Sequence, residues 1–327
     1  LYTAPSDEAL LFDIKAMKEL GFNMIRKHIK VEPSRWYMHC DREGILVWQD
    51  LPSPNLPAGH EAFARQNFEE EAVRIIDAFE NHPSIVQWVV FMRVGQFDTE
   101  RMTQVVIDKV SPQSLVCCAS GWNDAEIGDI KDSHSYPYPS CPIDQKRACV
   151  NGEYGGITLK VPGHIWPGGD FGYTAVETPE DFTVMFNDLA DKIKDHYYYG
   201  LNAAVYTQLS DVEIEKNGIY TYDRRILKPY SPTGELKDKI LECINMPQSD
   251  VKIQPVVSTA KEHKYKWKFI TEDNAPRHWF PKGSTTAYGP KGLPHSERVH
   301  YGIRKDLSPY LGPHRKFTCA VGSTWAT

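Results

Sequence analysis

One glutamate in this sequence, Glu153, has neighbours that suit a catalytic carboxylate. A short apolar run leads into it, and an aromatic residue and two glycines follow at once (A-C-V-N-G-E-Y-G-G). A strand that ends in a carboxylate and a permissive turn places that carboxylate at the carboxyl edge of a sheet, where β/α enzymes keep their reacting groups. We therefore interpret Glu153 as a catalytic nucleophile. From this stretch alone, the alternative is a surface glutamate at the end of a strand.

Length and composition describe a globular chain with room for a large core. The chain has 327 residues, of which 41% are hydrophobic and 12% aromatic. A net charge of -6 argues against a nucleic-acid partner, and no apolar run is long enough to span a membrane. The seven cysteines have no C-x-x-C spacing, so neither a zinc site nor a disulfide framework follows from them. We expect no metal and no cofactor, while compartment and oligomeric state stay open.

Short apolar runs alternate with amphipathic helices along most of the chain. Predicted strands cover residues 23–28, 45–50, 84–91, 114–120, 129–137, 148–153 and 201–209, and predicted helices lie at about 6–21, 33–44, 63–80, 98–110 and 178–200. Repeated strand, helix and strand with links of this length predict a parallel sheet flanked by helices. Seven strands in this rhythm predict an α/β fold of the (β/α)8 TIM barrel type that lacks its first strand.

Seven ordered blocks of sequence resemble a known family. They are R-K-H-I-K-V-E-P-S-R-W-Y, L-V-W-Q-D-L-P-S, N-H-P-S-I-V-x-W, G-Q-F-D-T-E-R, A-S-G-W-N-D, N-G-E-Y-G-G and A-A-V-Y-T-Q-L-S-D-V-E-I-E-x-N-G. Together they resemble the catalytic barrel of glycoside hydrolase family 2, the β-galactosidase-like group. The resemblance runs from Leu1 to about Pro247. In the family, other domains and the first barrel strand come earlier, so we expect a fragment or an incomplete gene model.

The resemblance implies retaining hydrolysis of a β-galactoside or a related β-glycoside. That reaction needs two carboxyl groups roughly 5 Å apart, one as nucleophile and one as acid/base. Glu153 stands at the place of the nucleophile, at the end of the seventh barrel strand. The acid/base would be the glutamate of an N-E pair that ends the fourth strand.

The acid/base position departs from the family pattern. Where the family reads F-N-E-G-W-G-Q-F-D-T, this chain reads F-M-R-V-G-Q-F-D-T from Phe91, one residue shorter. Met92 replaces the asparagine that would hold the sugar 2-hydroxyl, and Arg93 replaces the glutamate. A guanidinium stays protonated near neutral pH and cannot act as a general acid. The nearest acids, Asp98 and Glu100, suit helix capping better.

The residues Met92-Arg93-Val94-Gly95 also match a shifted reading of the family pattern. Written as AAT GAG GGT TGG GGN, N-E-G-W-G without its first base becomes ATG AGG GTT GGG, which encodes M-R-V-G. Discarding the two remaining bases restores the frame at Gln96. Two origins stay open: compensating indels in the gene, which leave a protein without its acid, or a sequencing error, which hides an active glycosidase.

Positions at strand ends predict further substrate-binding residues. We expect this role for Arg26, His28, Asp50, Met92, His134, Tyr136, Tyr206 and Gln208, and for Trp166 in a loop. The alternative for each strand-end residue is a structural hydrogen bond or core packing. Trp166 and Trp122 are each either a stacking platform for a sugar or a loop anchor.

A change of composition predicts a domain boundary near Pro247. We expect residues 1–247 to form the barrel and residues 248–327 a basic, β-rich segment. Tyr265 to Phe280 alternates like a strand and resembles the opening of the β-sandwich modules that follow some barrels of the family. Too few residues remain for a complete module, and we assign it no binding activity.

Two functions from different classes follow. The first is an exo-acting retaining β-glycosidase with Glu153 as nucleophile. The second is a non-catalytic relative that binds sugars or partners through the same site, which the Met92-Arg93 change supports. A structural scaffold without a ligand is a third reading.

Overall fold

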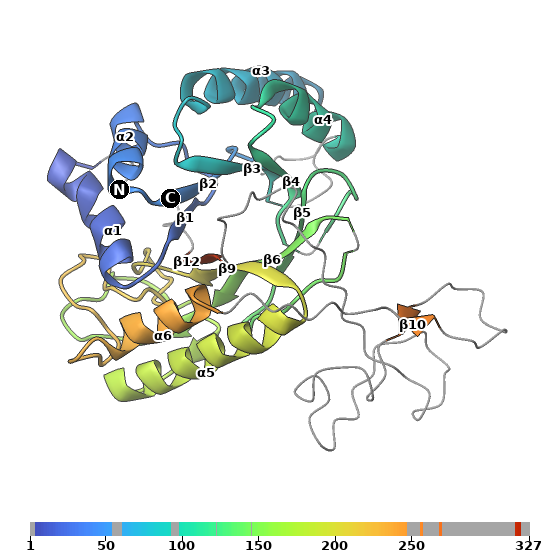
Figure 1. Ribbon diagram of the computed structural model, residues 1–327. Helices are drawn as coiled ribbons and strands as arrows, with labels where there is room; N and C mark the ends of the chain where they lie inside the picture. Colours follow the sequence, from blue (N-terminus) through green and yellow to red (C-terminus); the bar gives the residue numbers. More distant parts are fainter. Residues whose placement is uncertain are drawn as a thin grey trace.

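The computed structural model describes residues 4–53, 61–92, 98–121, 123–144, 146–246, 256–257, 268–269 and 318–321. Within these residues a parallel sheet has the strand order β4-β3-β2-β1-β12-β9-β6-β5, and helices lie around its outside (Figure 1). The strands are β1 (Met24–Lys27), β2 (Leu46–Asp50), β3 (Ile85–Phe91), β4 (Leu115–Ala119), β5 (Ile130–His134), β6 (Ala148–Gly155), β9 (Leu201–Thr207) and β12 (Thr318–Val321). This arrangement confirms the predicted α/β fold of the TIM barrel type.

Five of the helices in the described residues lie close to the ranges that the sequence predicts, and the helix after residue 234 was not predicted. They are α1 (Asp7–Glu19), α2 (Ser34–Glu43), α3 (Glu61–Phe79), α4 (Thr99–Lys109), α5 (Pro179–Tyr198) and α6 (Glu235–Ile244). Thr178 and Asp181 cap the first turn of α5 reciprocally, with Pro179 at its first position. Ser6 accepts the N–H of Ala9 at the start of α1. For α1 and α5, local sequence therefore explains both the capping residues and the helix that they begin.

The segment β12 occupies the place of the missing first barrel strand. It pairs in parallel with β1 on one side, where Met24 is opposite Ala320, and with β9 on the other, where Ala204 is opposite Cys319. Figure 1 shows β12 between these two strands. A strand from the far end of the chain thus joins the sheet at the gap that the sequence predicts.

The sheet ends at β4 and β5, which lie next to each other. The N–H of Asp129 donates to the carbonyl of Val116 at 2.8 Å, and the N–H of Val116 donates to Oδ2 of Asp129 at 2.9 Å. The described parts of the links 120–129 and 135–147 contain no helix. Strict alternation of strand and helix therefore stops on this side of the sheet.

Buried apolar side chains form two layers. One layer joins the strands to the helices, and the other contains only strand residues, such as Met24, Val89 and Val205. Tyr206 belongs to the first layer, where its ring contacts Phe186 of α5 at 5.2 Å between centroids. Neighbouring residues on a strand face opposite sides of the sheet. The prediction that Tyr206 binds substrate is therefore wrong.

Little of the predicted C-terminal unit lies within the described residues. Besides β12 they include β10 (Val256–Val257), which pairs in antiparallel fashion with β11 (Lys268–Phe269). Two further short strands, β7 (Ile157–Thr158) and β8 (Thr174–Ala175), pair beside the main sheet. Across the described ranges, every helix is too short or too polar to cross a bilayer.

Candidate active site

Glu153 lies near the end of β6 and has polar neighbours from several strand ends. Its Oε1 is 3.4 Å from Nη1 of Arg26, and its Oε2 is 3.1 Å from Nδ1 of His134. The hydroxyl of Tyr136 donates to Oε2 at 2.8 Å, and His28 lies 3.9 Å from Oε1. The structure thus brings together the predicted nucleophile and four of the predicted site residues.

These neighbours hold the Glu153 carboxyl group in its ionised form. Burial by itself would raise the pKa of Glu153, but His134, His28 and Arg26 lower it well below its usual range. The Glu153 side chain is 12% exposed, against 1% for Arg26 and 2% for His134. The carboxylate is therefore ionised near neutral pH and is more accessible than the groups that hold it.

Asp50 fixes Arg26 and His28 beside Glu153. Its carboxylate accepts from Nε of Arg26 at 3.1 Å and from Nη2 at 2.8 Å, and it lies 3.1 Å from Nδ1 of His28. Burial would raise the pKa of Asp50, but Arg26 and His28 lower it. Only 2% of the Asp50 side chain is exposed. Asp50 therefore positions Arg26 and His28, and its contact with substrate stays a prediction.

A second buried carboxylate, Asp132, supports the residues next to Glu153. The sequence analysis did not identify it. Its Oδ1 accepts the N–H of Gly152 at 2.6 Å, and its Oδ2 accepts the hydroxyl of Ser120 at 2.5 Å. The Ser120 oxygen lies 2.7 Å from Nε2 of His134. Asp132 thus anchors both the backbone before Glu153 and the imidazole beside it. The signal in the sequence is its spacing of two residues from His134 on one strand.

The contacts around His134 favour an imidazolium. Because the Ser120 hydroxyl donates to Asp132, Nε2 of His134 must donate to Ser120, while Nδ1 faces the carboxylate of Glu153. Burial would lower the pKa of His134, but Glu153 and Asp132 raise it to about 9. His134 therefore carries a positive charge beside the nucleophile at neutral pH.

Glycines make room for this arrangement. A Cβ on Gly152 would lie 2.2 Å from the Asp132 carboxylate, and a Cβ on Gly156 would lie 2.5 Å from the ring of Tyr173. Gly155 and Gly156 both have positive φ, which confirms the predicted permissive turn after Glu153. The glycines of N-G-E-Y-G-G are thus explained by close approach and by backbone conformation.

Tyr136 is held in place from two directions. Its ring stacks on Tyr173 with 3.6 Å between centroids and 3° between planes. Its hydroxyl oxygen lies 2.9 Å from Oγ1 of Thr207. Burial and the charge of Glu153 raise the pKa of Tyr136 well above its usual value, so the hydroxyl keeps its proton for Glu153.

Other predicted site residues have weaker links to Glu153. Met92 directly follows β3 and is half-buried, while Arg93 and Trp122 lie outside the described residues. Trp166 is 41% exposed, and its ring meets Tyr222 edge to face at 5.5 Å, as a loop anchor would. These placements leave their substrate contacts as predictions.

Gln208 points instead to a further acid, Glu215, which sequence reasoning did not single out. The amide of buried Gln208 donates to Oε2 of Glu215 at 3.1 Å and to Oδ1 of Asn217 at 2.7 Å. Burial raises the pKa of Glu215, the hydrogen bond from Gln208 lowers it, and the charge of Glu153 raises it, to about 7. The block E-I-E-x-N-G contains Glu215, but nothing in that block marks it as a site residue.

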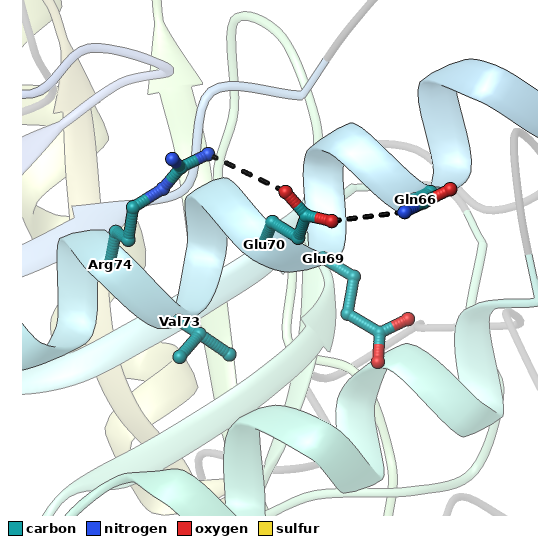
Figure 2. A pocket seen from close by; sticks show the side chains of 5 residues that line it. All are labelled: Gln66, Glu69, Glu70, Val73 and Arg74. Atoms are coloured by element: carbon teal, nitrogen blue, oxygen red, sulfur yellow. Dashed lines mark hydrogen bonds and ion pairs between the residues drawn. The ribbon is translucent and has the colours of Figure 1, made fainter.

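A shallow hollow on α3 is separate from this cluster. It is lined by Gln66, Glu69, Glu70, Val73 and Arg74 (Figure 2). There Glu70 accepts from Gln66 at 3.1 Å and pairs with Arg74 at 4.0 Å, as neighbours on a helix surface do. The described residues contain no group of His, Cys, Asp and Glu suited to a metal ion.

Comparisons with known proteins agree with this fold. The family model for glycosyl hydrolases family 2, TIM barrel domain, matches residues 4–242. A β-galactosidase of Halalkalibacterium halodurans is 33% identical over 96 residues, which cover 25% of this chain and 9% of that protein. A mannosylglycoprotein endo-β-mannosidase of Lilium longiflorum is 24% identical over 289 residues, which cover 72% of this chain and 26% of that protein.

Among solved structures, a family 2 β-galacturonidase from Eisenbergiella tayi bound to galacturonate is similar in fold. The TM-score is 0.55 at 16% identity, over 73% of this chain and 48% of that one. This chain thus spans a small part of the two curated relatives and about half of the solved structure. Because the family model covers most of the chain, the chain belongs to glycosyl hydrolases family 2, in the part of the family that forms the TIM barrel domain.

Proposed function

We propose that this chain carries the nucleophilic half of a retaining β-glycosidase, with Glu153 as the nucleophile. The observation that supports this most is the ionised carboxylate at the end of β6, held by Arg26, His134 and Tyr136. In the first step a Glu153 oxygen bonds to the anomeric carbon. The bond from that carbon to the leaving oxygen breaks, and its electron pair stays on the departing group.

The sequence as written lacks the acid/base glutamate that the retaining reaction also needs. Arg93 stands where the family glutamate would protonate the leaving oxygen and later activate water. We therefore expect ordinary glycosides to react about 10² to 10⁴ times more slowly than with an acid/base present. A leaving group that departs as a stable anion, such as dinitrophenolate, does not need the proton.

The substrate class is proposed to be a β-galactoside or a related β-glycoside. The family acts on carbohydrates, and its members similar to this chain include a β-galactosidase and a β-galacturonidase. These names leave the substituent at carbon 6 of the sugar undecided.

A burst experiment tests the proposal. With 2,4-dinitrophenyl β-galactoside, dinitrophenolate should be released in a fast phase equal to the protein concentration. A slow phase should follow, because hydrolysis of the glycosyl–Glu153 ester lacks its base. Mass spectrometry should find the sugar on the peptide that contains Glu153. The Glu153→Gln variant, which keeps the shape of the side chain, should show neither the burst nor the label.

The second candidate, a non-catalytic sugar-binding relative, is favoured by the Met92-Arg93 change. It predicts calorimetric binding of galactose without any burst from the activated glycoside. A burst that is unchanged in Glu153→Gln would contradict both candidates, because the nucleophile would then lie elsewhere.

A further inference from the structure

Glu215 adds a carboxyl group to the Glu153 site that the retaining reaction does not use. It is half-buried in the segment after β9, and its Oε2 accepts from Gln208 at 3.1 Å. Thr207, the residue before Gln208, reaches Glu153 through the hydroxyl of Tyr136, with steps of 2.9 and 2.8 Å. Glu215 therefore belongs to the strand end that adjoins the nucleophile, since β9 pairs directly with β6.

The contacts of Glu215 leave one oxygen available to a ligand. Among the described residues, its side-chain hydrogen bond involves Oε2, and it forms no ion pair with any of their cations. The nearby lysines have partners of their own: Lys216 pairs with Asp170, and Lys228 pairs with Asp211. Glu215 thus presents Oε1 as an acceptor, and no described cation offsets its charge.

The two described cations beside Glu153, Arg26 and His134, are already engaged as well. Arg26 is bidentate to Asp50 and also contacts Glu153, and His134 is bound between Glu153 and Ser120. Binding of an anionic sugar normally requires a cation that is free to pair with its carboxylate. Among the described residues of this cluster, neither cation is free in that way.

We propose that Glu215 determines substrate class at the Glu153 site: its carboxyl group accepts a hydroxyl of a neutral sugar and disfavours uronides. This inference rests on the proposed function, and it decides between the two sugar classes that the relatives leave open. At an effective dielectric constant near 20, two carboxylates on neighbouring groups repel strongly enough to change binding by roughly 100-fold. A neutral galactoside has a hydroxyl in place of the second charge and gains a hydrogen bond to a charged acceptor.

A pair of covalent probes tests this inference. The rate of Glu153 labelling is measured with the 2,4-dinitrophenyl 2-deoxy-2-fluoro derivatives of β-galactose and of β-galacturonic acid. The measurement is made at pH 8, because Glu215 with a pKa of about 7 is then ionised. Glu215→Gln keeps the size of the side chain and removes its charge. The matched control is Glu213→Gln, which changes an exposed glutamate in the same segment.

The expected result is a wild-type preference for the galactoside probe that falls at least about tenfold in Glu215→Gln and stays unchanged in Glu213→Gln. A preference that is the same in wild type and Glu215→Gln would overturn the role of Glu215 alone. Faster labelling of wild type by the uronide would do the same. If neither probe labels wild-type Glu153, the proposed function fails, and this inference fails with it.

Discussion

Nδ1 of His134 lies 3.1 Å from Oε2 of Glu153, and the imidazole is bound on its other side by Ser120 at 2.7 Å. Ser120 in turn donates to Asp132. The positive imidazole of His134 therefore lies between two carboxylates, those of Glu153 and Asp132. The cation between the two carboxylates keeps Glu153 ionised. The same chain of contacts also fixes the direction in which the carboxylate points.

Asp132→Asn should slow the first chemical step without preventing folding. The amide cannot accept both the Gly152 N–H and the Ser120 hydroxyl as the carboxylate does, so both Glu153 and His134 lose their anchor. We expect the dinitrophenolate burst to be about 10- to 100-fold slower, as small misplacements of a reacting group produce. Stopped-flow measurement of the burst checks this.

A structural control separates this effect from general destabilisation. Asp41→Asn removes another carboxylate that accepts a backbone N–H, that of Ser84, which lies just before the start of β3, whereas Glu153 lies near the end of β6. This control should lose stability and keep the burst rate. In Asp132→Asn, NMR should also show a lower pKa for His134. An unchanged His134 pKa in that variant would mean that Asp132 has no electrostatic role.

Stability should fall as the pH rises from about 6.5 to 9, because of His134. Its pKa in the folded chain is raised to about 9, above the ordinary value of 6.5. A raised histidine pKa contributes stability that is complete below the unfolded value and is lost as the pH passes the folded value. We expect a loss of about 2 to 3 kcal/mol in unfolding free energy across this interval.

Urea denaturation at pH 6 and pH 9.5 measures this loss. His134→Gln provides the reference, because its unfolding free energy contains no contribution from the imidazole. The difference between wild type and His134→Gln should shrink as the pH rises. A difference that is constant from pH 6 to pH 9.5 would show that His134 is not charged in the folded chain.

Much of this site could be predicted from sequence because its members sit at strand ends. Parallel strands bring their carboxyl ends to one edge, so the periodicity that located β1, β5 and β6 also brought Arg26, His134 and Glu153 together. Positions just after strands follow from the same rule, which explains why His28 and Tyr136 also lie beside Glu153.

The failures have equally physical causes. Tyr206 was assigned to the site because strand ends look alike in sequence, yet its neighbour Thr207 faces the site and Tyr206 faces α5. Asp132 was missed although it lies two residues before His134 on one strand, because its anchoring contact with Gly152 joins two strands and appears only in the folded sheet. Glu215 was missed because it lies in the segment after β9, where no strand-end pattern marks it. The position of β12 is of the same kind, since only the folded sheet shows which gap residues 318–321 fill.

Arg26→Met should destabilise the chain strongly. The change leaves Asp50 buried without its main cation and removes one of the two cations beside Glu153, and breaking such a buried pair typically costs about 3 to 5 kcal/mol. The matched control is Arg224→Met. Arg224 also makes a bidentate pair, with Asp13, but its side chain is 33% exposed, so the loss should be about 1 kcal/mol or less. Equal midpoints of urea unfolding for the two variants would contradict the buried ion pair.

Restoring the family pattern after Phe91 should restore acid/base chemistry. Replacing Met92-Arg93-Val94-Gly95 by N-E-G-W-G returns the missing residue and places a carboxyl group at the end of β3, on the same edge of the sheet as Glu153. Turnover of glycosides with poor leaving groups should rise by about 10² to 10⁴. The rate of the dinitrophenolate burst should change much less, because that leaving group needs no proton. Steady-state kinetics on a methyl or lactose-type β-galactoside measures the gain.

The same insertion with glutamine, N-Q-G-W-G, is the control for a merely structural repair. It restores length and packing but has no proton to give, so it should fold as well as the glutamate version and keep the slow rate. If both insertions raise turnover equally, the change at Met92-Arg93 is one of packing.

The peptide masses of the natural protein across Phe91 to Gln96 show whether the substitution is real. Met92 and Arg93 in the peptide would mean that the gene encodes the substitution, and asparagine and glutamate would mean a reading error. Coding DNA that is not one base away from the family pattern would defeat the frameshift hypothesis, because no single shift could then produce all four residues and the shorter length.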